Sequence, residues 1–396
     1  MLSLFRNAFG GLSRQVWLLA LVMFINRSGT MVIAFLTVYL TQKLYFSVSQ
    51  AGFVMMFFGV GSIFGTWMGG KLTDKIGYYP IQFWSLLLGG IMFLVMVQSQ
   101  NFYLLCFFAF LLSTMGEAYR PANSASIADF STPETFTRSL SLIRLAINVG
   151  WAIGPAIGGF LASRDYKLLF WADGITNIGA AIMVWSFLRS TRRKKTTNEP
   201  VVAVSKKDSA LRDRYYIIFL LLATLYATAF FQLFTIGPLY YKQVCLLSEI
   251  QIGYLLGLNG ILVAFFEMIF IYKIEGRFQK LVLISFGAFL VVPNYIIFLL
   301  TQNYIWLIIG VIFSTFSEMF AMPFMNSFSI ERAKPHNRGQ YSALYAMSWS
   351  VAQISSPLIG TQTVAHFGFE TLWYILGSFA LIASVGFLFL KKAMLL

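Results

Sequence analysis

The sequence predicts an all-α membrane protein with twelve transmembrane helices in two pseudo-symmetric six-helix bundles. Three observations support this fold class: an apolar composition, twelve apolar runs of spanning length, and an internal repeat. The chain is 58% hydrophobic and 11% charged, whereas an average soluble domain is roughly 25% charged. It therefore has too few polar side chains to cover a surface that faces water.

Each apolar run is long enough to cross a bilayer as a helix, which takes about 20 residues. The runs are continuous, whereas the strands of a membrane barrel alternate apolar and polar residues over about 10 positions. The expected helices span 15–41, 48–71, 79–98, 103–127, 136–162, 167–188, 215–240, 249–272, 280–300, 304–327, 338–364 and 369–390.

The second half of the chain repeats marks of the first about 201 residues later. The stretch STMGE at 113–117 returns as STFSE at 314–318, and the paired Gln50 and Gly52 return as Gln251 and Gly253. Such duplication in a membrane chain indicates two related halves with a substrate site where they meet, near the bilayer midplane. The repeat therefore favours a transporter of a small-molecule substrate.

A basic segment separates the two halves. We expect a first bundle over 1–190, a linker over 191–213 and a second bundle over 214–396, with nine basic residues from Arg189 to Arg214. A linker beside an anionic leaflet accounts for these charges. The net charge of +14 therefore does not require nucleic acid as a partner.

The distribution of the remaining basic residues predicts the orientation. With both termini cytoplasmic, the external loops contain only Lys43, Arg164, Lys167 and Lys242, as the positive-inside rule requires. We expect a multi-pass protein of a bacterial inner membrane that is a monomer in contact with the lipid bilayer.

No pattern of catalytic or metal-binding residues is present in the sequence. Cys106 and Cys245 have no ligand spacing, and His336 and His366 lie far apart. Nucleophile elbows, phosphate loops and dinucleotide fingerprints are also missing. We expect no enzymatic activity, no metal and no cofactor.

The loop between the second and third expected helices reads GGKLTDKIG over 69–77. It resembles the signature G-x-L-x-D-R-x-G-R-K of the major facilitator superfamily, although Tyr78 and Tyr79 replace the final basic residues. The resemblance implies a cytoplasmic gate, with Asp74 at a helix end where it can meet a positive helix terminus or a basic side chain. The alternative is a topogenic loop with one solvated acid. The gate residues implied are Gly70, Asp74, Lys75, Gly77 and, as a partner, Arg338.

The fifth expected helix contains GWAIGPAIGG over 150–159, which resembles the element G-x-x-x-G-P-x-x-G-G of the drug/proton antiporter branch. Its glycines recur every four residues and permit close backbone approach, and the proline removes a backbone donor. This packing could equally serve a symporter, and the branch signature R-x-x-Q-G is not matched after Arg120. The motif residues are Gly150, Gly154, Pro155, Gly158 and Gly159.

Three acids lie at one depth inside apolar helices: Glu117, Glu267 and Glu318. A charge there costs at least about 2.5–3.5 kcal/mol, so each must pair, face water or be neutral part of the time. We interpret all three as candidates for proton coupling. The available positive partners are Arg27, Arg120 and Arg144. Glu117 and Arg120 share a helix face and could also form a purely structural pair.

The resemblance also implies that helices one, four, seven and ten line a central cavity. It places a further set of residues there: Asn26, Arg27, Tyr39, Arg120, Gln232 and Tyr240. Because aromatic residues make up 17% of the chain, packing or interfacial roles for the two tyrosines stay open.

These features lead to a functional hypothesis. A proton-coupled secondary transporter working by alternating access would export small amphipathic or drug-like molecules in exchange for protons. The alternative is a proton-coupled symporter that imports peptides, siderophores or other metabolites, which the deep arginines could bind through a carboxylate. A transporter-like receptor that moves nothing is a third class, and the retained gate loop argues against it.

Overall fold

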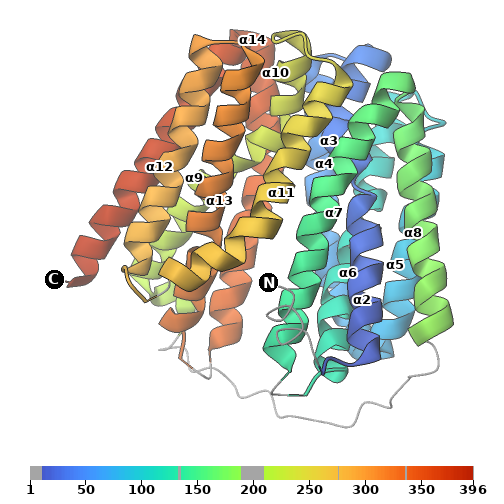
Figure 1. The fold of residues 1–396 in the computed structure, drawn as a ribbon, viewed down its shortest axis with the longest axis horizontal. Helices are drawn as coiled ribbons and strands as arrows, with labels where there is room; N and C mark the ends of the chain where they lie inside the picture. The colour runs from blue at the N-terminus through green and yellow to red at the C-terminus, as the bar shows by residue number, and fades with distance from the viewer. Residues whose placement is uncertain (1–10, 133–134, 189–208, 275, 335–336, 396) are drawn as a thin grey trace. The chain divides into compact units, whose positions relative to one another are not determined.

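The computed structural model describes residues 11–132, 135–188, 209–274, 276–334 and 337–395, and these ranges are helical apart from short connections. Figure 1 traces these helices along the chain by label and colour. Their bounds are α2 (Arg14–Ser28), α3 (Met31–Val38), the π-helix η1 (Tyr39–Lys43), α4 (Val48–Ile76), α5 (Tyr78–Met96), α6 (Phe102–Asp129), α7 (Phe136–Arg164), α8 (Lys167–Leu188), the 3₁₀-helix η4 (Ala210–Arg212), α9 (Arg214–Thr235), α10 (Gly237–Gln243), α11 (Glu249–Ile274), α12 (Lys280–Leu300), α13 (Tyr304–Arg332) and α14 (Arg338–Leu395).

The helices confirm the expected membrane spans. Eleven helices or helix series in the described ranges are long and apolar enough to cross a membrane. The last of them, Gln340–Met394, contains the final two expected helices, because α14 is interrupted at Gly368 with φ +83°. Expected helix one is divided into α2, α3 and η1, and expected helix seven into α9 and α10.

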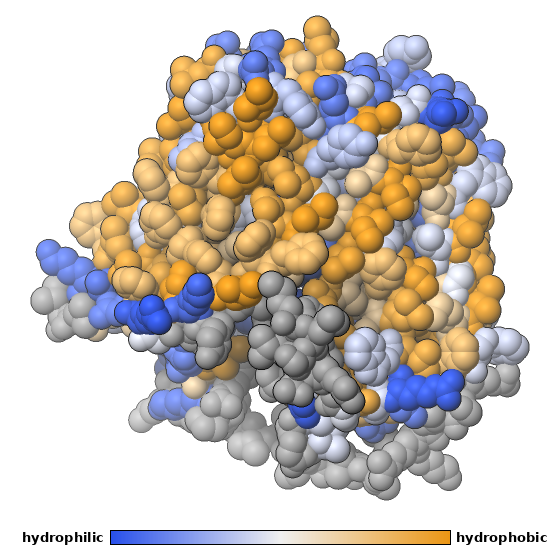
Figure 2. Space-filling model, viewed as in Figure 1, coloured by the Kyte–Doolittle hydropathy of each residue, from blue (hydrophilic) through white to orange (hydrophobic). Residues whose placement is uncertain are grey.

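The surface supports a lipid environment for these helices. Large apolar side chains such as Trp67, Phe265 and Phe389 are more than half exposed. Figure 2 shows apolar side chains over the middle of the visible face and hydrophilic ones gathered toward its two ends. Hydrocarbon lipid tails can cover such an apolar band.

The chain divides into two compact units, and each unit includes the start of one helix whose remaining residues belong to the other unit. Unit 1 comprises Met1–Phe46, Phe53–Thr196 and Ser248–Ala264, and unit 2 comprises Ser47–Gly52, Thr197–Leu247 and Phe265–Leu396. The start of α4 therefore groups with unit 2, and the start of α11 with unit 1. Most of the expected linker 191–213 lies outside the described residues, but its end is folded into η4 and the cap of α9.

The repeated glutamines of the sequence close equivalent capping boxes. At the start of α4, Gln50 Oε1 accepts from the Ser47 amide at 3.0 Å, and the Gln50 amide donates to Ser47 Oγ at 3.1 Å. At the start of α11, Ser248 and Gln251 make the same pair of bonds at 3.0 and 3.3 Å. Each box satisfies amides that a helix start otherwise leaves without partners.

The repeated glycines follow directly after these boxes. Gly52 packs against Thr361 of α14, and Ser49 Oγ accepts from Gln362 Nε2 at 2.6 Å. Gly253 of α11 packs against α7, where an added β-carbon would lie 3.0 Å from Gly159 Cα. The repeat thus preserves a helix start and the close contact that this start makes.

One face of α7 packs against the discontinuous first helix, and Figure 1 shows α7 beside α2. A β-carbon at Gly150 would lie 2.7 Å from Arg27 Cβ, and one at Gly154 would lie 2.9 Å from the Ser28 carbonyl oxygen. The third glycine of this row, Gly158, faces Met31 at 3.0 Å. A larger residue at Gly150 or Gly154 would displace the backbone around Arg27 and Ser28, and one at Gly158 would crowd the Met31 side chain.

The adjoining face of α7 packs against the first part of α11. A β-carbon at Gly253 would lie 2.6 Å from the Pro155 carbonyl oxygen, and one at Gly260 would lie 2.5 Å from Ala152 Cα. Two helices therefore touch α7 at backbone distance, one on each of two neighbouring faces.

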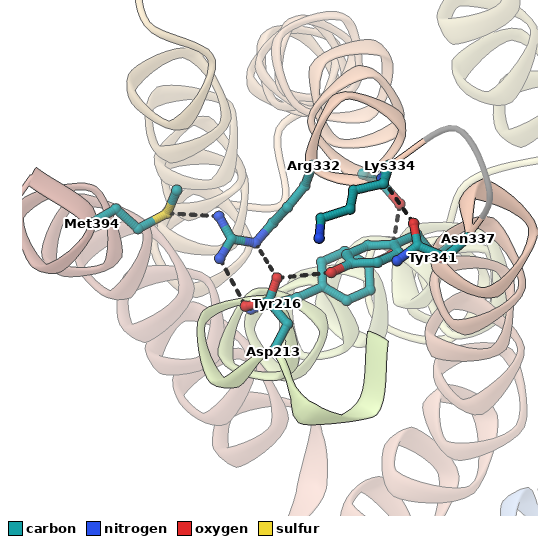
Figure 3. A network of polar contacts seen from close by, with 8 residues as sticks. Asp213, Tyr216, Arg332, Lys334, Asn337, Tyr341 and Met394 are labelled. Carbon is teal, nitrogen blue, oxygen red and sulfur yellow. Dashed lines mark hydrogen bonds and ion pairs between the residues drawn. The ribbon is translucent and has the colours of Figure 1, made fainter. Parts of the chain in front are cut away.

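A network of polar contacts holds the α9, α13 and α14 ends of unit 2 together (Figure 3). Asp213 caps α9, accepts from Arg332 Nε at 2.5 Å and Nη2 at 2.7 Å, and accepts from Tyr341 Oη at 3.0 Å. Tyr216 Oη donates to the Tyr341 carbonyl at 2.6 Å and contacts Ser329 Oγ at 2.6 Å. Arg332 Nη1 also reaches Met394 Sδ at 3.9 Å.

This network changes the acidity of Asp213. Burial on its own raises the pKa of Asp213, but the hydrogen bonds from Arg332, the Tyr216 amide and Tyr341, with the charge of Arg332, outweigh burial and lower that pKa below its ordinary value. A carboxylate with a lowered pKa stabilises the fold above its unfolded pKa of about 3.9. That stabilisation is lost as the pH falls through the folded pKa.

Replacing Asp213 tests the network. D213N keeps a good helix cap but loses the charge, so we expect it to reduce the free energy of unfolding by about 1.5–3 kcal/mol at neutral pH. The difference from wild type should shrink as the pH falls below about 3.9. Thermal unfolding in detergent across a pH series measures both effects. A difference that stays constant with pH would contradict the ionic role.

The α7 packing gives a second prediction. G159A introduces a β-carbon against the backbone of α11 and should destabilise the protein by about 1–3 kcal/mol. The matched control is G179A in α8, where the space around the glycine is open; it should be neutral or stabilising by up to about 1 kcal/mol. Equal melting temperatures for the two variants would contradict the proposed contact.

Candidate functional site

The candidate site of unit 1 lies around the break in the first helix. The α-helical bonding of α2 ends at Ser28, the Gly29 amide bonds back to the Ile25 carbonyl at 3.1 Å, and α3 restarts at Met31. Thr30 Oγ1 donates to the Arg27 carbonyl at 2.8 Å. The break thus places Arg27 at the end of α2, against Gly150 of α7.

Asp173 of α8 caps the restarted helix. Its Oδ1 accepts from the Met31 amide at 3.2 Å and its Oδ2 from the Val32 amide at 2.8 Å. Asp173 is 0% exposed. Asp173 is not among the site residues predicted from the sequence, although an acid in an otherwise apolar run is the same signal that identified the three glutamates.

A cluster of charges adjoins the break. Glu117 and Arg120 of α6 form an ion pair, with Arg120 Nη2 at 3.1 Å from Glu117 Oε2. The Glu117 side chain is 13% exposed and the Arg120 side chain 62%. Arg27 is close enough to interact electrostatically with both. Two of the three expected basic partners, Arg27 and Arg120, therefore gather around one acid.

Several buried polar atoms in this region make no hydrogen bond within the described part of the chain. They are Arg27 Nε, Ser28 Oγ and Ser113 Oγ. Buried polar groups in folded proteins almost always have a partner. Together with the Glu117 carboxylate, these atoms suit a polar or charged group of a substrate, or a proton.

The acids of unit 2 lie in different surroundings. Glu318 of α13 is half-buried and follows Ser317, whose hydroxyl lies 3.0 Å from Tyr226 Oη. The Tyr226 ring contacts Trp349 with ring centroids 6.5 Å apart, and Phe231 contacts the same tryptophan at 5.7 Å. Glu318 interacts electrostatically with Tyr226. A carboxylate beside aromatic rings can attract an organic cation.

Glu267 and Arg144 occupy different helices. Glu267 of α11 is 4% exposed, near Phe270, which packs on Phe320 of α13 with ring centroids 4.5 Å apart. Arg144 is exposed on α7.

Four residues expected in a central cavity make contacts between packed helices in this structure: Asn26 and Tyr39 in unit 1, and Gln232 and Tyr240 in unit 2. Asn26 Nδ2 donates to Asn177 Oδ1 of α8 at 2.8 Å. Tyr39 packs on Phe170 of α8 with ring centroids 5.0 Å apart.

In unit 2, Gln232 Nε2 donates to the Ser356 carbonyl at 2.5 Å, and Tyr240 Oη donates to the Phe298 carbonyl at 2.7 Å. Tyr39, Gln232 and Tyr240 are at most 3% exposed. They therefore fill the contacts between helices rather than open space.

The gate loop connects α4 and α5. Gly77 has φ +89°, a conformation that favours glycine, and it separates the two helices. Asp74 and Lys75 are exposed in the last turn of α4, and the space around Gly70 is open. The backbone of Arg338 begins α14, but its side chain lies outside the described residues.

Tyr78 stands at a loop position that differs from the family signature, and it has a structural role there. Its hydroxyl donates to Asp129 Oδ2 at 2.8 Å, and its ring packs on Phe130 with centroids 5.9 Å apart. A hydrogen bond from a phenol to a carboxylate therefore ties the start of α5 to the end of α6, at a position where the family signature has a basic residue.

The described residues contain no group of three histidine, cysteine or acidic side chains that could hold a metal ion.

The whole chain resembles known transport proteins. A Na(+), Li(+), K(+)/H(+) antiporter of Planococcus maritimus is 25% identical over 404 residues, which cover 93% of this chain and 92% of that protein. The quinolone resistance protein NorA of Staphylococcus aureus (strain MRSA252) is 24% identical over 310 residues, covering 77% and 78%.

Solved structures share the fold at low identity. The peptide transporter POT in complex with sulfate has a TM-score of 0.79 and 16% identity, covering 97% of this chain and 95% of that one. A point mutant of the nucleoside transporter NupG also has a TM-score of 0.79, with 12% identity and coverage of 95% and 100%.

The family model described as Major Facilitator Superfamily matches residues 16–357 and 280–394. This match spans most of the chain and agrees with the helical fold. The chain therefore belongs to the Major Facilitator Superfamily and is a secondary transporter rather than an enzyme.

Proposed function

We propose that this transporter exchanges protons for small amphipathic or drug-like cations and exports them from a bacterial cell. In this proposal both chain termini are cytoplasmic, the protein acts as a monomer, and its two bundles alternate in opening a site to either side. The observation that carries the proposal is the ion pair of Glu117 and Arg120 at 3.1 Å, with Glu117 only 13% exposed inside a membrane helix.

An ion pair with a largely buried acid is suited to exchange because the ionised Glu117 is costly to leave without its partner. Protonation of Glu117 would neutralise the acid and release Arg120, whose side chain is already 62% exposed. A cationic substrate could instead compete for the same carboxylate. Since proton and cation neutralise the same group, binding of one disfavours the other, which is the basis of antiport.

Unit 2 supports a cationic and partly apolar substrate. Glu318 provides a negative charge and interacts with Tyr226. The half-buried rings of Phe231 and Trp349, which contact each other and of which Trp349 also contacts Tyr226, provide aromatic surface. A cation over an aromatic face gains about 0.5–2 kcal/mol. The quinolone resistance protein NorA, similar over 77% of this chain, is consistent with such a substrate.

A second candidate function is exchange of monovalent metal cations for protons. The specific observation in its favour is the similarity to the Na(+), Li(+), K(+)/H(+) antiporter over 93% of the chain. The two candidates share the acids and differ in the role of the aromatic side chains, because a metal ion needs oxygen ligands rather than rings.

Everted membrane vesicles with an imposed pH gradient test the proposal and separate the candidates. We expect ethidium or tetraphenylphosphonium to enter the vesicles in exchange for protons, and E117Q and E318Q each to reduce this exchange by about tenfold or more. Dissipation of the gradient by Na⁺, Li⁺ or K⁺ alone would favour the second candidate.

The matched control is E331Q, which makes the same change on an exposed glutamate of α13. It should exchange at the wild-type rate. Exchange that survives E117Q and E318Q combined would refute the assignment of these acids. Uptake of dipeptides or organic anions together with protons, lost on substitution of Arg27 or Arg120, would instead indicate the symporter.

A further inference from the structure

Asp173 is a buried acid that takes no part in the proposed exchange of protons for cations. The carboxylate accepts the Met31 and Val32 amides, at 3.2 and 2.8 Å, and within the described residues these are its only polar contacts. Both amides belong to the first turn of α3, where a helix leaves its amides without internal partners and has a partial positive charge. The acid thus stabilises the restart of the broken helix.

The helices around Asp173 provide no cation to pair with it. Within the described residues, the positive residue next to the break is Arg27 of α2, whose electrostatic partners are Glu117, Arg120 and Tyr119. Helix α3 contains no titratable side chain, and α7 faces the break with glycines. The remaining titratable residues of the packed helices are Arg14 of α2, Tyr39 and Lys43 of η1, Tyr78 and Tyr79 of α5, Arg138, Arg144 and Arg164 of α7, and Lys167 of α8.

A proton and the helix amides compete for the same two oxygens. The ionised carboxylate accepts both amides but is an uncompensated charge, which costs at least about 2.5–3.5 kcal/mol inside a membrane. A proton removes this charge and converts one oxygen into a donor. That oxygen can no longer hold its amide, and the longer bond, from Met31, is the weaker one.

We propose that Asp173 binds and releases a proton, and that its protonation state controls the break between α2 and α3. Protonation frees the first turn of α3 from α8. Since Arg27 lies at the end of α2, directly before the break, the same event changes its position relative to Glu117. The binding of the proton stands on the geometry alone, whereas its coupling to transport rests on the proposed proton exchange.

Hydrogen–deuterium exchange of the purified protein tests the release of α3. After correction for the intrinsic pH dependence of exchange, a wild-type peptide covering Met31–Val38 should exchange about tenfold faster at acidic than at alkaline pH. D173N retains one acceptor oxygen but cannot bind the proton, so its exchange should not depend on pH. The control D165N removes a half-buried acid just before the start of α8 and should behave as wild type.

A second measurement on the wild-type protein avoids any effect of the substitution on folding. A hydrophobic carbodiimide reacts with protonated buried carboxyl groups, so mass spectrometry should find Asp173 modified more at acidic than at alkaline pH. Exchange and labelling that are both independent of pH would overturn the proposal. Neither measurement uses a substrate, so failure of exchange in vesicles would leave a positive result at Asp173 standing.

Discussion

The close backbone packing of α7 is the constraint on which the rest of unit 1 depends. Its row of glycines lies against Arg27, Ser28 and Met31, so the first helix can break at Gly29 without losing contact with its neighbour. The adjoining face meets α11 at similar distances. Any side chain in either row would push a helix outward. The position of the charged residues at the break is therefore set by residues that have no side chain.

The two units handle buried charge in different ways. In unit 1 the acids have protein partners of opposite kind: Glu117 pairs with Arg120, and Asp173 accepts backbone amides. In unit 2, Glu318 lies beside aromatic rings. In the proposed exchange, the acids of unit 1 bind the proton and Glu318 of unit 2 attracts the organic cation.

The fold was largely predictable from the sequence, because apolar runs of spanning length report directly on membrane helices. The breaks within helices were not, since Gly29 and Thr30 carry no strong breaker signal and their conformation depends on Asp173, which is distant in sequence. The glutamates were found from their apolar context. The surroundings of Tyr39, Gln232 and Tyr240 could not be found this way, because whether a side chain faces a cavity or a neighbouring helix depends on helix rotation.

The two halves of the repeat begin α4 and α11 in the same way but begin their first helices, α2 and α9, in different ways. The capping boxes at Gln50 and Gln251 are alike, yet the start of α9 is held by an ionic network around Asp213. At the start of α2, Ser13 Oγ instead accepts from the Val16 amide at 3.3 Å and donates to the Phe130 carbonyl at 2.9 Å. Three helices of unit 2 are thus fixed at that end by charge. Unit 1 instead has a broken first helix restarted on two amide bonds. Under the proposed protonation of Asp173, the helix restart in unit 1 is therefore the point at which a single added proton acts.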